Sequence, residues 1–142
     1  MTATQEYATL AAANCPMAFD NLTRQLYATD ASHYQIEPVA VAFPRNAAQV
    51  SSAIQAAGHA GVSVIPRGAG TGLVGGAIGD GLVMDLARHS RWIADFDREK
   101  QTVRVGAGVV LDQLNAFLRP HGFSFGPDVA TSSRATIGGM IG

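Results

Sequence analysis

Compact apolar runs alternate with stretches of helical periodicity in the first half of the chain. Residues 38–44 and 62–65 are apolar, β-branched runs bounded by proline or polar residues, which predicts two buried strands. Residues 47–60 carry apolar side chains at helical spacing, so we expect a helix between the strands. This succession predicts a β-α-β unit whose second strand runs parallel to the first.

The ends of the expected helix carry start and stop residues. Asn46, followed three residues later by Gln49, predicts a capping box at the first turn. Gly61 stands where a left-handed residue would end the helix. The side chains expected to face the core are Val50, Ile54 and Ala57.

Two short helices are expected before this unit. Residues 1–16 are alanine-rich and mildly helical, up to a proline that favours a break. The next segment places Phe19, Leu22 and Leu26 at helical spacing, which predicts an amphipathic helix packed on the edge of the domain. The polar run at residues 27–32 is interpreted as a capped turn rather than as a ligand contact.

The second half of the chain is richer in strands. Residues 81–86 predict a further strand, and residues 92–96 and 102–105 flank a polar tetrapeptide, as in a β-hairpin. Residues 110–118 predict a helix that ends at Pro120. Its expected apolar face consists of Val110, Leu111, Leu114, Phe117 and Leu118. The fold class is therefore α+β, with a small β-α-β subdomain followed by a strand-rich one.

Composition sets limits on function. The chain has 142 residues, 47% hydrophobic and 15% charged, with a net charge of −1, which suffices for one domain with a core. The near-neutral charge gives no support for binding nucleic acid. Cys15 is alone and the four histidines are scattered, so neither a disulfide framework nor a metal site is predicted. No apolar run approaches the roughly 18 residues of a membrane span, and the start lacks a signal peptide's basic region. We therefore expect no integral membrane segment and a cytoplasmic location.

The segment from Pro66 to Ala77 concentrates the candidate chemistry. It contains five glycines and directly follows a predicted strand. Because glycine lacks Cβ, backbone N–H groups can converge there on an anion, of which phosphate is the usual example. Arg67 could add a positive charge.

Three kinds of phosphate loop compete for this segment. A Walker loop is excluded because the segment has no lysine. Residues 70–75 match the letters of the Rossmann fingerprint, but that motif needs a helix opening across its glycines. The glycines that follow each disfavour a helix by about 1 kcal/mol. We therefore expect a long loop that wraps a pyrophosphate without a helix. An ordinary glycine-rich turn is the alternative, disfavoured because so many glycines are costly to order without a ligand.

Two blocks of the chain resemble a known family. Residues 67–77 resemble the pyrophosphate loop of the FAD-linked oxidases with a PCMH-type (vanillyl-alcohol-oxidase-like) flavin domain. Residues 126–142 resemble that family's second flavin-binding segment, and the two blocks stand in the family's order and approximate spacing. The branch most similar to the chain contains glycolate oxidase, D-lactate dehydrogenase and D-2-hydroxyglutarate dehydrogenase. The run at residues 27–32 is common in that branch.

The resemblance implies a PCMH-type FAD-binding domain in which two subdomains clasp FAD. The amides of residues 68–72 would meet the pyrophosphate, and the second block would close over the other side, with Thr136 as a helix N-cap. Thr71 matches the histidine that attaches the flavin covalently in some relatives, so non-covalent FAD is expected. The cofactor-binding residues predicted in this way are Pro66, Arg67, Gly68, Ala69, Gly70, Thr71, Gly72, Leu73, Gly76, Pro127, Asp128, Ser132, Ser133, Thr136, Gly138 and Gly139.

The activity implied by the resemblance is the flavin-dependent oxidation of a 2-hydroxy acid of the glycolate or D-lactate type, with hydride transfer to flavin N5. The electron acceptor stays open, and an iron–sulfur module is one option. No catalytic residue is predicted, because the family's substrate-holding residues lie in a later cap domain. A sugar or alcohol oxidase of the same superfamily and a non-catalytic nucleotide-binding module remain alternatives.

For domain organisation, we expect an amino-terminal helical segment at residues 1–34 and the FAD-binding domain at residues 35–142. Relatives continue beyond the second block with more of the flavin domain. The resemblance therefore implies a domain truncated at its carboxyl end, which alone would turn over no substrate.

Overall fold

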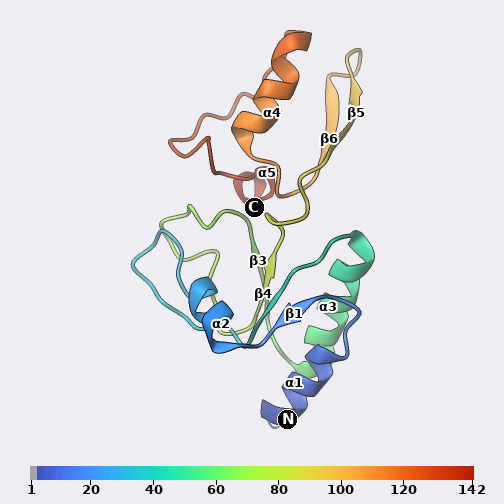
Figure 1. Cartoon of the computed structure of the whole chain (residues 1–142). Coiled ribbons are helices and arrows are strands. Elements are labelled where there is room, and N and C mark those ends of the chain that lie inside the picture. The colour runs from blue at the N-terminus through green and yellow to red at the C-terminus, as the bar shows by residue number, and fades with distance from the viewer. Residues whose placement is uncertain (1–2) are drawn as a thin grey trace.

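The chain folds into two lobes stacked one above the other, as a computed structural model that describes residues 3–142 shows (Figure 1). The first lobe (residues 3–86) contains α1 (Ala3–Ala11), β1 (Met17–Ala18), α2 (Asn21–Tyr27), β2 (Ala40–Ala42), α3 (Ala47–Ala60), β3 (Val64–Arg67) and β4 (Leu82–Asp85). The second lobe (residues 93–142) contains β5 (Ile93–Asp97), β6 (Thr102–Val105), α4 (Leu111–Leu118), the 3-10 helix η1 (Arg119–His121) and α5 (Ile137–Ile141). The α+β class predicted from the sequence is confirmed.

The sheet of the first lobe has the strand order β1-β2-β4-β3. β2 and β3 are both parallel to β4, as the sequence predicts for the β-α-β unit, but β4 lies between them. All residues of the two interior strands, β2 and β4, are buried. β1 pairs antiparallel with β2 through Met17 and Ala42. The sequence did not predict β1, because two residues carry no detectable alternation.

Helix α3 has the predicted bounds and caps. Asn46 Oδ1 accepts a hydrogen bond from the Gln49 amide at 2.9 Å, and Gly61 ends the helix with a φ of 69°. In a capping box the Gln49 side chain would accept from the amide of Asn46. Here it accepts from the amide of Arg45, one residue earlier.

The core face of α3 differs in part from the predicted one. Ala57 is buried and Val50 packs against the core as predicted, but Ile54 is 49% exposed. Three further alanines face the sheet: Ala53, Ala56 and Ala60 are buried. Small side chains let the helix approach the sheet closely, whereas the 3.6-residue period alone does not distinguish this face from the one through Ile54. Helix α1 packs on α3 and places Leu10 in the same core.

Helix α2 forms in the predicted segment and has a side-chain cap, but none of its residues is buried. Asp20 accepts a hydrogen bond from the Thr23 amide, whereas Leu22 and Leu26 are 70% and 66% exposed. The predicted helix is therefore confirmed and Phe19 packs against the core, whereas the predicted packing of Leu22 and Leu26 is wrong. Polar contacts hold the helix: Arg24 donates to the carbonyl of Pro38 and pairs with Glu37 at 2.7 Å.

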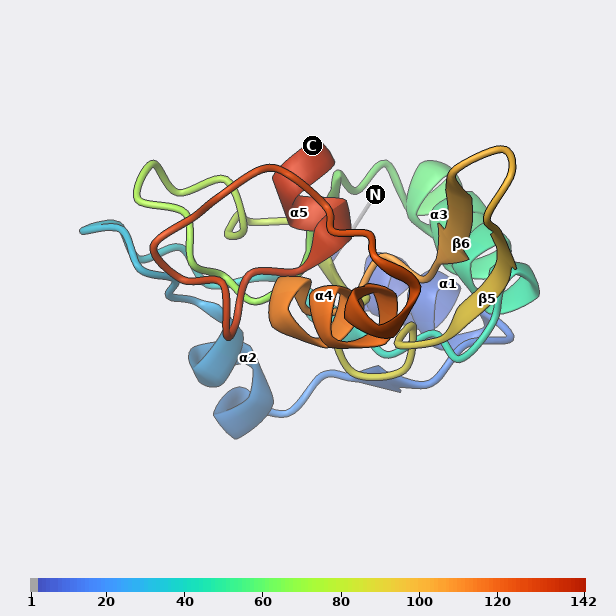
Figure 2. The ribbon, with the colours of Figure 1, turned by 90° about the horizontal axis from the view of Figure 1, so that it is seen from above.

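The second lobe packs the β5–β6 hairpin against α4, and Figure 2 looks down on α4 and α5 from above. Its core contains Val109, Leu111, Leu114, Leu118 and Ile137. Phe117, predicted on the buried face, is 38% exposed and meets Phe96 edge to face. Among residues 3–142, no helix combines the length and apolarity needed to cross a membrane.

Candidate functional site

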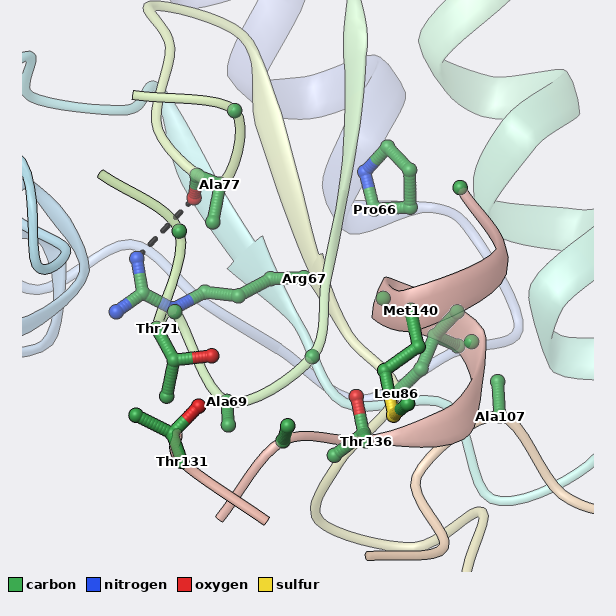
Figure 3. A pocket seen from close by; sticks show the side chains of 18 of the residues that line it. Pro66, Arg67, Ala69, Thr71, Ala77, Leu86, Ala107, Thr131, Thr136 and Met140 are labelled. Atoms are coloured by element: carbon green, nitrogen blue, oxygen red, sulfur yellow. Dashed lines mark hydrogen bonds between the residues drawn. The ribbon is translucent and has the colours of Figure 1, made fainter. Parts of the chain in front are cut away.

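A cavity of about 730 Å³ lies between the two lobes. One wall, the loop wall, consists of residues 66–77 and belongs to the first lobe. The other, the helix wall, consists of residues 129–142 with Ala107 and belongs to the second lobe (Figure 3). The predicted site residues that line the cavity are Pro66, Arg67, Gly68, Ala69, Gly70, Thr71, Gly72, Gly76, Thr136, Gly138 and Gly139. The structure therefore brings residues from both predicted blocks to one cavity.

The loop wall begins where the sheet ends. At the end of β3, the carbonyl of Arg67 accepts a hydrogen bond from the Leu86 amide at 3.0 Å. Residues 68–77 then form neither helix nor strand, as predicted from their glycines. Within residues 3–142, no protein group accepts a hydrogen bond from the amides of residues 68–72. These residues are half-buried or exposed, so their amides are accessible to a bound acceptor.

Arg67 directs its guanidinium to backbone carbonyls. It donates to the carbonyl of Thr29 at 2.8 Å, to that of Ala77 at 3.1 Å and to that of Tyr27 at 3.4 Å. The guanidinium also lies 5.2 Å from the centre of the Tyr27 ring. Among the described lining residues Arg67 is the sole charged one, and its three hydrogen bonds brace the loop.

The helix wall has its first amides already paired. The amide of Ile137 donates to the carbonyl of Val109 at 2.8 Å, and that of Gly138 donates to the carbonyl of Ala107 at 2.9 Å. Thr136 occupies the predicted N-cap position of α5 but makes no side-chain capping bond. This wall therefore offers side chains and close-packed backbone rather than a set of free amides.

The hydroxyl of Thr136 has no partner. It is buried, and within residues 3–142 no group hydrogen-bonds to Thr136 Oγ1. A Cβ atom on Gly68 would lie 2.2 Å from this oxygen, so the two walls approach each other here and need glycine at position 68. A buried hydroxyl without a partner is unfavourable by about 1–3 kcal/mol. The residues that carry the unpaired hydroxyl and the unpaired amides line one cavity, and these groups fit a guest rich in hydrogen-bond acceptors, such as a diphosphate.

Five predicted residues do not line the cavity. Leu73 is 74% exposed at the tip of the loop wall. Pro127, Asp128 and Ser133 are exposed, and Ser132 is half-buried. Ser132 instead fixes its own segment, because its amide donates to the carbonyl of Val129 and its carbonyl accepts from the amide of Asp112. A contact of these residues with a cofactor stays a prediction.

Much of the remaining lining is apolar, and the sequence prediction missed it. Leu86 follows directly on β4, and Met140 lies four residues after Thr136, on the next turn of α5 (Figure 3). The other missed lining residues are Val74, Ala77, Ala107, Val129, Thr131, Ala135 and Gly142. The position of Leu86 at the carboxyl end of a parallel strand was a usable signal, since ligands gather at that edge.

A buried carboxylate lies beneath the loop wall. Asp85, 7% exposed, accepts a hydrogen bond from the Tyr27 hydroxyl at 2.5 Å and one from the Arg88 amide at 3.0 Å. Burial of the ring, and then the hydrogen bond to Asp85, raise the pKa of Tyr27 well above its ordinary value. The tyrosine is therefore a stable donor at neutral pH.

Comparisons with known proteins agree with this geometry. The family described as FAD binding domain matches residues 38–142. The chain is 49% identical over 116 residues to a D-2-hydroxyglutarate dehydrogenase of Pantoea ananatis, covering 80% of this chain and 11% of that protein. It is 37% identical over 132 residues to glycolate oxidase subunit GlcD of Bacillus subtilis, covering 89% of this chain and 28% of that protein.

The fold also matches solved structures. An alkyldihydroxyacetonephosphate synthase superposes with a TM-score of 0.80 at 23% identity, covering 98% of this chain and 29% of that one. This likeness establishes the fold. The chain thus spans well under two thirds of the proteins it matches.

Proposed function

Because this chain belongs to the family of FAD binding domains, we propose that it supplies the FAD-binding part of an oxidoreductase that oxidises a 2-hydroxy acid. FAD is the cofactor of the family. The substrate class is inferred from the names of the relatives, since 2-hydroxyglutarate and glycolate are both 2-hydroxy acids.

The observation that carries the proposal is the set of unpaired amides at residues 68–72, which line the same cavity as Thr136 with its unpaired hydroxyl. We assign the amides to the diphosphate of FAD, and the hydroxyl to an oxygen of the same cofactor. No aspartate or glutamate is found among the described residues that line the cavity, so nothing there repels a dianion. The apolar lining at Leu86 and Met140 suits the aromatic part of the cofactor and excludes water.

Bound FAD would supply a hydride acceptor at its N5 atom. The contribution of this chain is binding and orientation: the amides hold the diphosphate, and the two lobes fix the cofactor between them. We propose that FAD is held without a covalent bond, because the hydroxyl of Thr71 stands where some relatives carry an attaching histidine. We assign the binding of the hydroxy acid to none of the described residues. The division of the chain at residues 34 and 35 also stays a proposal.

Isothermal titration of the apo protein with FAD tests the cofactor assignment, with saturable one-to-one binding as the expected result. Acid precipitation of the complex should release all flavin into the supernatant, whereas flavin that stays in the pellet would contradict non-covalent attachment. Activity is assayed with this chain and with any longer product of the same gene. The assay offers D-2-hydroxyglutarate, D-lactate, glycolate and a reducing sugar with an artificial electron acceptor. Oxidation of the sugar alone would overturn the hydroxy-acid assignment.

A further inference from the structure

Residues 27–32, called the clasp here, lie against the outer side of the loop wall. They were interpreted from the sequence as a capped turn, and the local bonds agree: Asp30 Oδ1 accepts from the Ser32 amide at 2.8 Å, and Ser32 Oγ accepts from the Tyr34 amide. Among the described residues that line the cavity, none comes from the clasp. Its hydrogen bonds contact the glycine-rich loop outside the cavity lining.

The clasp touches the loop at two separated points. The amide of Ala31 donates to the carbonyl of Gly70 at 2.9 Å, and Asp30 Oδ2 accepts from the amide of Ala77 at 3.4 Å. Arg67 also links the clasp to the end of the loop, because its guanidinium donates to the carbonyl of Thr29 in the clasp and to that of Ala77 in the loop. The start and the end of the loop are thereby tied to one external support.

That support is itself anchored to the sheet. The Tyr27 hydroxyl donates to the buried Asp85 at the end of β4, and Ala28 is fully buried. The amide of Ile36 donates to the carbonyl of Ala28 at 2.9 Å, which closes the segment on itself. A segment fixed at its base can hold a glycine-rich loop in one conformation, which such a loop would not keep unaided.

We propose that Asp30 and Arg67 are positioning residues, which hold the amides of residues 68–72 in the binding conformation before the cofactor arrives. This inference rests on the proposed assignment of those amides to the diphosphate of FAD. Loss of the clasp contacts lowers the fraction of protein in the competent conformation, and the apparent affinity falls by that fraction. Because the bound state is unchanged, the loss falls on the association rate and not on the dissociation rate.

Stopped-flow measurement of FAD binding, by the change in flavin fluorescence, separates the two rates. Asp30→Ala removes the acceptor for both Ser32 and Ala77, and we expect association about tenfold slower, the effect of one hydrogen bond to a charged group. Dissociation should change by less than about twofold, as follows from an unaltered bound state. Asp30→Asn keeps one acceptor and should lie between. Arg67→Lys should also slow association, because one ammonium cannot span the carbonyls of Thr29 and Ala77.

Asp97→Ala is the matched control. Asp97 makes the same kind of turn, accepting from the amides of Glu99 and Lys100, but lies in the hairpin of the second lobe. Neither rate should change in this variant. An unchanged association rate in Asp30→Ala, or a faster dissociation alone, would overturn the inference, the latter because it indicates a direct contact with the cofactor.

Amide hydrogen exchange of the apo protein gives a readout independent of FAD. Exchange at the amide of Ala31, which donates to the carbonyl of Gly70, should accelerate in Asp30→Ala and stay unchanged in Asp97→Ala, while β2 and β4 stay protected in both. Wild-type protein that binds no FAD would contradict the proposed function, and the exchange data would still decide the positioning role. Equal exchange of the Ala31 amide in wild type and Asp30→Ala would overturn that role.

Discussion

The two walls of the cavity are both rich in glycine, yet glycine serves a different purpose in each. In the loop wall the chain leaves the sheet at Arg67, and the amides of residues 68–72 have no partner among the described residues. In the helix wall the amides of Ile137 and Gly138 are paired, and Gly138 instead allows close packing: a Cβ there would lie 2.7 Å from that of Ala107. Similar composition therefore supports ligand binding in the loop wall and close packing within the second lobe in the helix wall.

The largest effect is expected where the walls meet. In Gly68→Ala the new Cβ would lie 2.2 Å from Thr136 Oγ1, so either the Thr136 side chain must rotate or the walls must separate. Overpacking of this kind is unfavourable by about 1–3 kcal/mol, which corresponds to FAD affinity weakened about tenfold to a hundredfold. Titration calorimetry measures the change.

A double variant checks the cause of that loss. Adding Thr136→Ala to Gly68→Ala removes the oxygen that the new Cβ meets, so we expect part of the affinity to return and the two effects to be non-additive. Gly126→Ala is the control, because a Cβ there meets no atom within 4 Å. Additive losses would show that the walls do not meet at this point.

Gly138→Ala should act on stability first. The new methyl would meet Ala107 Cβ at 2.7 Å and the carbonyl oxygen of Ala107 at 3.0 Å. We expect a loss of about 1–3 kcal/mol in the free energy of unfolding, measured by urea denaturation. Ala107→Gly should restore part of this loss. If Gly138→Ala weakened FAD binding without destabilising the apo protein, the contrast between the walls would be wrong.

Tyr27→Phe tests the support of the loop wall. The change leaves the buried Asp85 with one hydrogen bond fewer, at an expected loss of about 1–3 kcal/mol in the free energy of unfolding. The pKa of Tyr27 is raised in the folded state. The wild type should therefore lose stability as the pH rises above about 10, the ordinary value for tyrosine. Denaturation curves from about pH 8 to about pH 11, a range that brackets this value, should show the loss of stability at high pH in the wild type and not in the variant.

Thr136→Val should give the smallest change, with opposite signs for stability and binding. Removing a buried hydroxyl without a partner should stabilise the apo protein by about 1 kcal/mol. The same change should weaken FAD binding, because the cofactor loses a donor. Thermal unfolding of the apo protein and titration with FAD measure the two effects. A variant that is less stable and binds FAD equally well would show that the hydroxyl has a structural role alone.

The sequence predicted the local features of this fold well, because caps and glycines act on neighbouring residues. Asn46 and Gly61 bounded α3, and the glycines after Arg67 predicted a loop without a helix. The exposed Ile54 and Leu22 were mispredicted, since a helical period does not tell which face meets a neighbour.

The candidate site shows the same division. Glycines near positions 68–72 indicated bare amides, and the structure shows these amides without protein partners. The apolar lining from Leu86 and Met140 was missed because it depends on how the two lobes dock. The unpaired hydroxyl of Thr136 was also hidden, since its position predicts a cap that the side chain does not make.

The central position of β4 bears on how the molecule acquires its shape. Within the described sheet β3 has β4 as its neighbour, and β2 meets β3 through β4 alone. During synthesis, β3 and the glycine-rich loop emerge before the strand that fixes them. The ordering of the loop therefore waits for a non-local pairing of the kind that slows folding. Until residue 85 has emerged, an exposed apolar edge on β3 is open to pairing with other chains.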